Sequence, residues 1–129
     1  MYKRQAFACP SIYEPLGIVN LEAMACETAV VATATGGIPE VVVDPHSGLG
    51  VTDGPATGRL VPIDQASDGT GTPLDPDRYV ADFAEALNSV VSDPSRAAEM
   101  GRAGRARAIS SFSWEAIAGR TVEVYRSVL

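Results

Sequence analysis

The sequence predicts an α/β fold in which a Rossmann-like parallel sheet is followed by C-terminal helices. Three apolar segments, residues 6–12, 29–35 and 58–63, have the length and composition of buried strands. Helical segments lie between the first strands, and the chain after about residue 77 is helical. This alternation builds βαβ units, whose strands run parallel and whose helices cover the sheet.

A turn joins the first predicted strand to the first predicted helix. Residues 6–12 form a short buried strand whose end is uncertain at Pro10, because proline cannot donate a hydrogen bond to a neighbouring strand. Proline and glycine in residues 13–17 predict a turn. Residues 18–26 are apolar on almost every side, which is typical of a buried helix. Residues 29–35 are uninterrupted and β-branched, like a central parallel strand.

Loops and capping residues place the later elements. Gly36-Gly37 predicts a tight turn before a short helix that begins at Ile38-Pro39-Glu40. Residues 44–57 and 64–73 are polar, glycine-rich loops on either side of the third strand. Asp75, Asp93 and Ser113 are predicted to cap three helices, at about residues 77–91, 95–109 and 114–128.

The apolar side chains of these helices indicate which faces pack. Tyr79, Val80, Phe83, Leu87 and Val90 or Val91 share one face of the first of these helices. In the last helix Ile117, Val124 and Tyr125 form the stripe, and Trp114 is predicted to pack in the core. The arginines of residues 102–107 are expected on a solvated helix face.

Composition bounds the class of protein. The 129 residues form one domain at most, and the net charge of −6 comes without a dense Lys/Arg cluster, so no nucleic-acid partner is expected. No apolar run reaches the ~20 residues of a transmembrane helix, and no secretory signal follows the basic residues 1–5. Cys9 and Cys26 lack the spacing of metal ligands and are predicted to be buried thiols, which makes the cytoplasm the expected location.

Two glutamates, Glu14 and Glu22, carry the strongest chemical signal. Glu14 lies in the turn after the first strand, and Glu22 lies in the second turn of the helix that follows. A carboxylate on a nearly apolar helix needs a partner or a wet cleft. Because helical side chains lean toward the N-terminus, Glu22 is expected to reach over Ile18, where it can accept both hydroxyls of a ribose. The alternative reading is a solvated loop residue and an ordinary acid near a helix start.

The helix start itself is a candidate anion site. The N–H groups of Leu16, Gly17 and Ile18 have no partner within the helix and can bind a diphosphate or sugar hydroxyl, helped by the helix dipole. Thr35-Gly36-Gly37 supplies a second set of N–H donors after the next strand, although a plain turn would look the same.

Residues 7–43 resemble the donor-site signature of retaining GT-B glycosyltransferases, the group 1 family that includes glycogen synthases, sucrose synthases and mannosyltransferases. In that family two glutamates with this spacing flank a Pro-(Phe/Leu)-Gly turn, and a Thr-Gly-Gly turn follows the next strand. The matching residues are Glu14, Pro15, Leu16, Gly17, Glu22, Thr35, Gly36, Gly37, Pro39 and Glu40. Residues 68–75 and 112–114 look most like actinobacterial glycogen synthases, which make α-1,4-glucan or its maltose-1-phosphate precursor.

The resemblance implies an enzyme and assigns roles to these residues. Glu22 would hold the nucleotide ribose, Glu14 would lie beside the donor sugar as the catalytic residue, and the Leu16–Ile18 backbone would bind sugar and phosphates. Thr35, Gly36 and Gly37 would complete the donor site. The implied donor is a nucleotide sugar such as ADP- or UDP-glucose, the implied acceptor is an α-glucan or glucose-1-phosphate, and neither cofactor nor metal is needed.

The resemblance also implies that residues 1–129 are one partial C-terminal, donor-binding domain. The family's Arg/Lys pair, its base-binding segment and its N-terminal acceptor domain have no counterpart in this sequence, and further strands of the sheet are expected before Ala6. The chain alone is therefore expected to be inactive. Alternatives are a mannosyltransferase acting on lipid or inositol acceptors, an inert nucleotide-sugar-binding fragment, and a GT-B nucleotide-sugar epimerase, which should lack this glutamate spacing.

Overall fold

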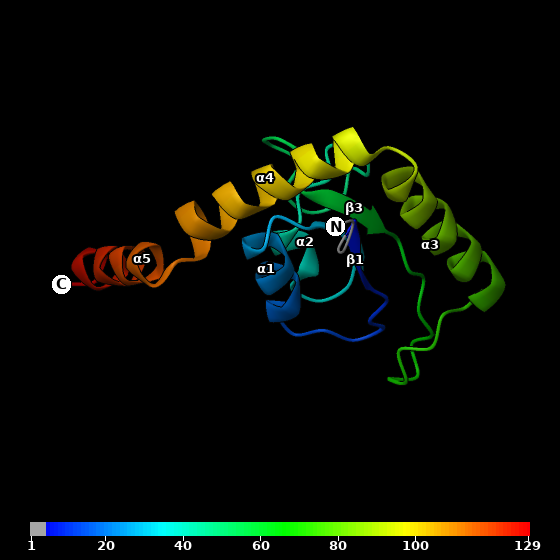
Figure 1. Ribbon diagram of the computed structural model, residues 1–129. Helices are drawn as coiled ribbons and strands as arrows, with labels where there is room; N and C mark the ends of the chain where they lie inside the picture. Colours follow the sequence, from blue (N-terminus) through cyan, green and yellow to red (C-terminus); the bar gives the residue numbers. More distant parts are fainter. Residues whose placement is uncertain (1–4) are drawn as a thin grey trace.

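The computed structural model describes residues 5–129 and confirms the predicted α/β fold (Figure 1). Met1 to Arg4, which include most of the basic stretch noted above, lie outside the described residues. The elements in chain order are β1 (Ala6–Cys9), α1 (Ile18–Ala25), β2 (Ala29–Thr33), α2 (Ile38–Val41), β3 (Gly58–Val61), α3 (Pro76–Val91), α4 (Pro94–Phe112) and α5 (Trp114–Ser127).

The three strands form one parallel sheet in the order β1-β2-β3. All five residues of the central strand β2 are buried. Each strand is shorter than its apolar segment, and the reasons are local. Pro10 and Pro62 follow β1 and β3 and cannot donate to a ladder. After Thr33 the chain turns on itself, since the Thr35 N–H donates to the Thr33 carbonyl at 2.9 Å.

Alternate residues of β2 supply two separate cores. Val30 and Ala32 face α1 and α2, where Met24 and Ile38 are fully buried. Val31 belongs to the second core, which includes Val90 of α3 and Met100 of α4. The sheet therefore has α1 and α2 on one face and α3 on the other, as a doubly wound sheet requires.

Helix α4 crosses the molecule and packs closely on α1 (Figure 1). A Cβ on Gly101 would lie 2.1 Å from the Glu27 carbonyl oxygen, so glycine is needed where the two segments meet. On the arginine face that was predicted to be solvated, Arg102 and Arg105 are exposed, whereas Arg107 is half-buried. Arg105 donates to the Ala25 carbonyl at 2.8 Å, and Arg107 donates to the Val41 carbonyl at 2.9 Å.

The three predicted helix caps are confirmed. Asp75, Asp93 and Ser113 accept hydrogen bonds from the N–H groups of Arg78, Arg96 and Ala116 respectively, at 3.0, 3.0 and 3.2 Å. These side chains satisfy N–H groups that have no partner inside their helices.

Three packing predictions are wrong. Trp114 is 84% exposed, and α5 contains no buried residue, because α5 contacts the end of α4 and extends away from the sheet (Figure 1). Val80 is 63% exposed although it was assigned to the packed face of α3. Helix α1 is also only half covered: Ile18 and Val19 face outward, and Cys26 at its end is exposed, whereas Cys9 is buried as predicted.

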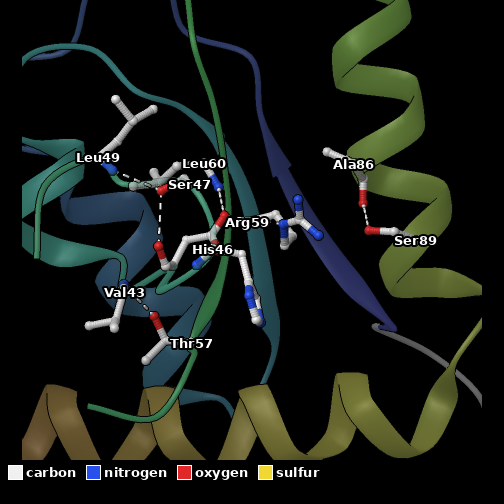
Figure 2. A network of polar contacts seen from close by, with 10 residues as sticks. Val43, His46, Ser47, Leu49, Thr57, Arg59, Leu60, Ala86 and Ser89 are labelled. Carbon is white, nitrogen blue, oxygen red and sulfur yellow. Dashed lines mark hydrogen bonds and ion pairs between the residues drawn. The ribbon is translucent and has the colours of Figure 1, made fainter. Parts of the chain in front are cut away.

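The loop between α2 and β3 is held by the buried carboxylate of Asp44, whose partners Leu60, Arg59 and His46 are labelled in Figure 2. This side chain accepts hydrogen bonds from the Leu60 N–H at 2.9 Å, Arg59 Nε at 3.1 Å and the His46 N–H at 3.2 Å. At the loop ends, the Val43 N–H donates to the Thr57 hydroxyl at 2.9 Å. The long loop is thus fastened to β3 at its base.

The second predicted loop, after β3, folds back on itself as a small hairpin, residues 64–74. The Leu74 N–H donates to the Asp64 carbonyl at 2.8 Å, and the Ala66 N–H donates to the Thr72 carbonyl at 3.0 Å. At its tip the hydroxyl and N–H of Thr70 donate to Asp68, which lowers the pKa of that carboxyl below its usual value. The hairpin projects beyond the carboxyl edge of the sheet, beside the loop that follows β1 (Figure 1).

Candidate functional site

The loops that follow β1 and β2 meet at the carboxyl ends of these neighbouring strands. The Gly37 N–H donates to the Glu14 carbonyl at 3.2 Å. A Cβ on Gly36 would lie 1.7 Å from the same oxygen, and one on Gly37 would lie 2.7 Å from the Pro15 carbonyl oxygen. Both positions therefore require glycine because the Glu14 turn lies against their backbone. The structure brings together five predicted site residues, Glu14, Leu16, Gly17, Gly36 and Gly37.

The Glu14 side chain closes its own turn. Its Oε1 accepts a hydrogen bond from the Gly17 N–H at 3.0 Å. Gly17 has a φ of +87° and is the residue that caps α1. A Cβ there would lie 3.1 Å from Ile38, so both the backbone conformation and the space favour glycine. The second carboxylate oxygen of Glu14 has no hydrogen bond within residues 5–129 and is available to a ligand.

The start of α1 presents unpaired N–H groups beside this turn. Among residues 5–129, neither the Leu16 nor the Ile18 N–H donates to another group of the protein. Leu16 is 45% and Ile18 57% exposed, so the backbone here is accessible. With the positive end of the helix dipole, these groups can bind an anion.

Glu22 lies one turn further along α1 and lines a different feature. It borders a hollow of about 380 Å³ between α1 and β1, together with Phe7, Val19 and Cys26. Glu22 is exposed. Its position on the α1 surface allows contact with a ligand that extends from the helix start along β1.

A buried amide lies directly under the Gly17 turn. Asn20 is fully buried, and within the described part of the chain neither its Oδ1 nor its Nδ2 has a hydrogen-bond partner. A Cβ on Gly17 would lie 2.9 Å from Asn20 Nδ2, so the amide fills the space beneath the turn. Asn20 is not among the site residues predicted from the sequence, although an uncharged polar side chain next to Glu22 in an otherwise apolar helix is a signal that could have found it. Thr35 is half-buried in the adjoining loop.

Two further observations concern the surroundings of the site. A hollow of about 360 Å³ beside the hairpin lies toward α3 and is lined by residues such as Asp64, Tyr79 and Asp82. None of the predicted donor-binding residues lines it.

In the described ranges, no three His, Cys, Asp or Glu side chains gather as a possible metal site, and no helix has the length and apolar character to span a membrane.

Comparison with known proteins bears on the family of the chain. The family model described as "Glycosyl transferases group 1" matches residues 1–107 of the chain. The alpha-maltose-1-phosphate synthase of Mycolicibacterium smegmatis is 54% identical over 122 residues, which is 95% of this chain and 27% of that protein. The D-inositol 3-phosphate glycosyltransferase of Kineococcus radiotolerans is 41% identical over 119 residues, 92% of this chain and 23% of that protein.

One solved structure has a similar fold. The sucrose-phosphate synthase of Thermosynechococcus elongatus superposes with a TM-score of 0.66 at 36% sequence identity, over 94% of this chain and 24% of that one. The chain thus spans about a quarter of the length of the proteins it matches.

Proposed function

Because the chain belongs to the group 1 glycosyl transferases, we propose that its loops after β1 and β2 form the nucleotide-sugar donor site of a retaining glycosyltransferase. The observation that carries this proposal is the contact between the Glu14 turn and Gly36-Gly37. This contact holds one carboxylate and the open N–H groups of the α1 start together at the carboxyl edge of the sheet. Ligands of doubly wound folds bind at this edge, outside the carboxyl ends of the strands.

Each predicted residue has a chemical role in this proposal. The N–H groups of Leu16 and Ile18 bind the diphosphate, and Gly17 allows its close approach. Glu22 accepts the two ribose hydroxyls from the surface of α1. Thr35, Gly36 and Gly37 close the opposite side of the site, where Gly36-Gly37 keeps the Glu14 turn in place.

Glu14 is the proposed catalytic residue. In transfer with retention, the bond between the anomeric carbon and the diphosphate oxygen breaks. An acceptor hydroxyl oxygen bonds to the same face of the sugar, and its proton passes to the departing diphosphate oxygen. Positive charge develops at the anomeric carbon as the diphosphate leaves. A carboxylate fixed beside that carbon stabilises this charge electrostatically, without forming a covalent intermediate. The hydrogen bond from Gly17 holds the Glu14 carboxylate in one orientation for this task.

We propose glucose as the transferred sugar and ADP- or UDP-glucose as the donor. The acceptor is an α-glucan or glucose-1-phosphate, which places the enzyme in glycogen biosynthesis. Support comes from the 54% identity to a protein named alpha-maltose-1-phosphate synthase and from the glycogen-synthase-like residues 68–75. The alternative is transfer to an inositol-type acceptor, which the relative named D-inositol 3-phosphate glycosyltransferase supports at 41% identity. A cytoplasmic location, consistent with two free cysteines, is part of this proposal.

We also propose that residues 1–129 are the donor half of a C-terminal domain and act with an acceptor domain. The cations that neutralise the leaving diphosphate would come from outside residues 5–129. The chain on its own should then bind nucleotide sugar weakly and transfer no sugar. In isolation it would behave as the inert nucleotide-sugar-binding fragment named above as an alternative. Nucleotide release from ADP-glucose by the isolated chain measures this directly.

A chimera tests the proposed function. This chain replaces the segment that it matches over 122 residues in the Mycolicibacterium smegmatis alpha-maltose-1-phosphate synthase. Glucose transfer from ADP-glucose and from UDP-glucose is then measured with glucose-1-phosphate, glycogen or inositol phosphate as acceptor. We expect transfer with retention in the chimera and none in the chain alone.

The chimera with Glu14→Ala and Glu22→Ala together is the inactive control. Circular dichroism and thermal unfolding establish that each protein is folded. A folded chimera that transfers sugar from neither nucleotide sugar would contradict the proposed function. Equal activity of the chimera and the double variant would contradict the assignment of the site.

A further inference from the structure

Gln65 connects the hairpin after β3 to the loop that carries Glu14. Its side-chain amide nitrogen Nε2 donates hydrogen bonds to the Ile12 carbonyl and, at 2.7 Å, to the Gly71 carbonyl. Ile12 precedes Glu14 by two residues. Since β2 lies between β1 and β3, the hairpin reaches past the end of the central strand to make this contact.

Residues on both sides of the hairpin hold the Gln65 amide against the Ile12 carbonyl. Gly71 has a φ of +73°, and a Cβ there would lie 3.2 Å from Gln65 Nε2 and 3.5 Å from the Ile12 carbonyl oxygen. A side chain at residue 71 would therefore press on the amide and on the carbonyl that it binds. Gln65 also pairs with Pro73 in an antiparallel bridge, which holds its backbone in the hairpin.

The loop after β1 has few other long-range attachments. Within residues 5–129, residues 10–17 receive hydrogen bonds from two distant parts of the chain. One comes from the Gly37 N–H to the Glu14 carbonyl, and the other comes from Gln65 to the Ile12 carbonyl. The segment from Ile12 to Glu14 is thus held by a hydrogen bond at each end. In the same part of the structure, the exposed Tyr13 between them makes no hydrogen bond to a distant residue.

We propose that Gln65 is a positioning residue, which fixes the Glu14 turn by holding the Ile12 carbonyl. This inference rests on the proposed function of Glu14. Loss of the amide lets the turn sample more conformations, so the carboxylate spends less time beside the anomeric carbon. Catalysis that depends on a carboxylate aimed at developing charge is sensitive to such displacement, because the stabilisation requires a preorganised geometry.

The amide has a suitable isosteric variant. Both groups facing Nε2 are carbonyl oxygens, which only accept hydrogen bonds. Gln65→Glu keeps the size of the side chain and places a carboxylate against two acceptors, so the contact is repelled. Thr70→Ala is the matched control, because Thr70 stabilises the tip of the same hairpin without touching Ile12.

The first arm of the experiment needs no substrate. Hydrogen exchange of the Gly17 N–H, which binds Glu14 Oε1, is measured in the 129-residue chain. We expect exchange to be at least about threefold faster in Gln65→Glu and unchanged in Thr70→Ala. Equal exchange in Gln65→Glu and the unaltered chain would overturn the anchoring of the turn.

The second arm is a kinetic cycle in the chimera described above. Gln65→Glu should lower kcat about tenfold with the donor KM changed by less than about twofold, because the effect passes through Glu14 and not through the nucleotide contacts. In the Glu14→Gln background, the same substitution should change kcat by less than about twofold. Thr70→Ala should leave both constants unchanged.

The outcomes separate this inference from the proposed function. A fall in kcat of the same size in both backgrounds would show that Gln65 acts independently of Glu14 and would overturn the positioning role. Unchanged kcat in Gln65→Glu would overturn it as well. If Glu14→Gln alone behaves as the unaltered chimera, the proposed function of Glu14 fails, and the positioning role fails with it, whatever the exchange experiment reports about the anchor.

Discussion

The carbonyl oxygen of Glu14 occupies the space that a side chain on Gly36 would need, since a Cβ there would lie 1.7 Å from it. Gly36 also has a φ of +53°, a conformation that side chains rarely adopt. The Gly36-Gly37 motif is therefore a packing surface for the turn that contains Glu14. The Thr-Gly-Gly turn and the Glu14 turn act as one unit at the carboxyl edge of the sheet.

Gly36→Ala should disturb this unit much more than Gly48→Ala. Gly48 has a similar φ of +67° and nothing within 4 Å of its Cβ position, so alanine there costs only the backbone strain of about 1–2 kcal/mol. Gly36→Ala adds a backbone clash worth about 1–3 kcal/mol and displaces Glu14. Urea unfolding and donor binding measure the two effects. Equal losses of stability and binding in both variants would contradict the packing argument.

Glu14→Gln and Glu22→Gln should fail in different ways in the chimera. The ribose is unchanged during the reaction, so losing Glu22 should mainly raise the donor KM. The lost binding free energy is at most about 2–4 kcal/mol, before water replaces the missing hydrogen bonds. Glu14 is proposed to act on charge that develops in the transition state, so Glu14→Gln should lower kcat by about tenfold or more. Steady-state kinetics with varied donor make the comparison.

Small changes in kcat and donor KM in both variants would contradict the assignment of the donor site. If kcat and donor KM stay within about twofold of the parent, less than ~0.5 kcal/mol, neither glutamate contacts the donor. Because glutamine preserves the size of both side chains, we expect both variants to fold, and circular dichroism gives the folded fraction by which kcat is corrected.

Asp44→Asn should lower the free energy of unfolding much more than the removal of an exposed carboxylate does. Asp44 is fully buried and accepts from Leu60, Arg59 and His46, so the variant leaves a partly buried guanidinium without its counterion (Figure 2). The expected loss in the free energy of unfolding is about 3 kcal/mol. Asp82→Asn removes an exposed ion pair to Arg78 and should cost less than about 0.5 kcal/mol. Similar unfolding midpoints for the two variants would refute this account.

The two thiols should differ in reactivity. Cys26 is exposed at the end of α1, whereas Cys9 is 5% exposed in β1 and lies beside the Ser11 hydroxyl at 3.4 Å. A thiol reagent should therefore modify one cysteine per chain in the native protein and the second only in denaturant. Cys26→Ser should abolish the fast reaction, and Cys9→Ser should leave it intact. Fast modification of both cysteines would contradict the burial of Cys9.

Local sequence determined the elements of this protein and most of their beginnings. The strands appear within their predicted apolar segments, because a parallel strand covered on both faces is apolar almost throughout, as β2 is. The prediction that the first strand is buried is wrong except at Cys9, because β1 lies at the edge of the described sheet. Asp75, Asp93 and Ser113 cap their helices as predicted, since capping depends on a side chain and an N–H only three residues apart. The Glu14 and Gly36-Gly37 motifs could be recognised for the same reason: each is contained in a few consecutive residues.

Tertiary structure decided which of these pieces touch. Periodicity gives Trp114 and Cys26 an apolar context but cannot tell whether another element covers them, and both are exposed. Gly36 lies 22 residues from Glu14 in the sequence and Gln65 lies 53 residues from Ile12, yet each pair is in contact. Such contacts depend on the order of strands in the sheet, which brings loop ends together through packing that no local pattern encodes.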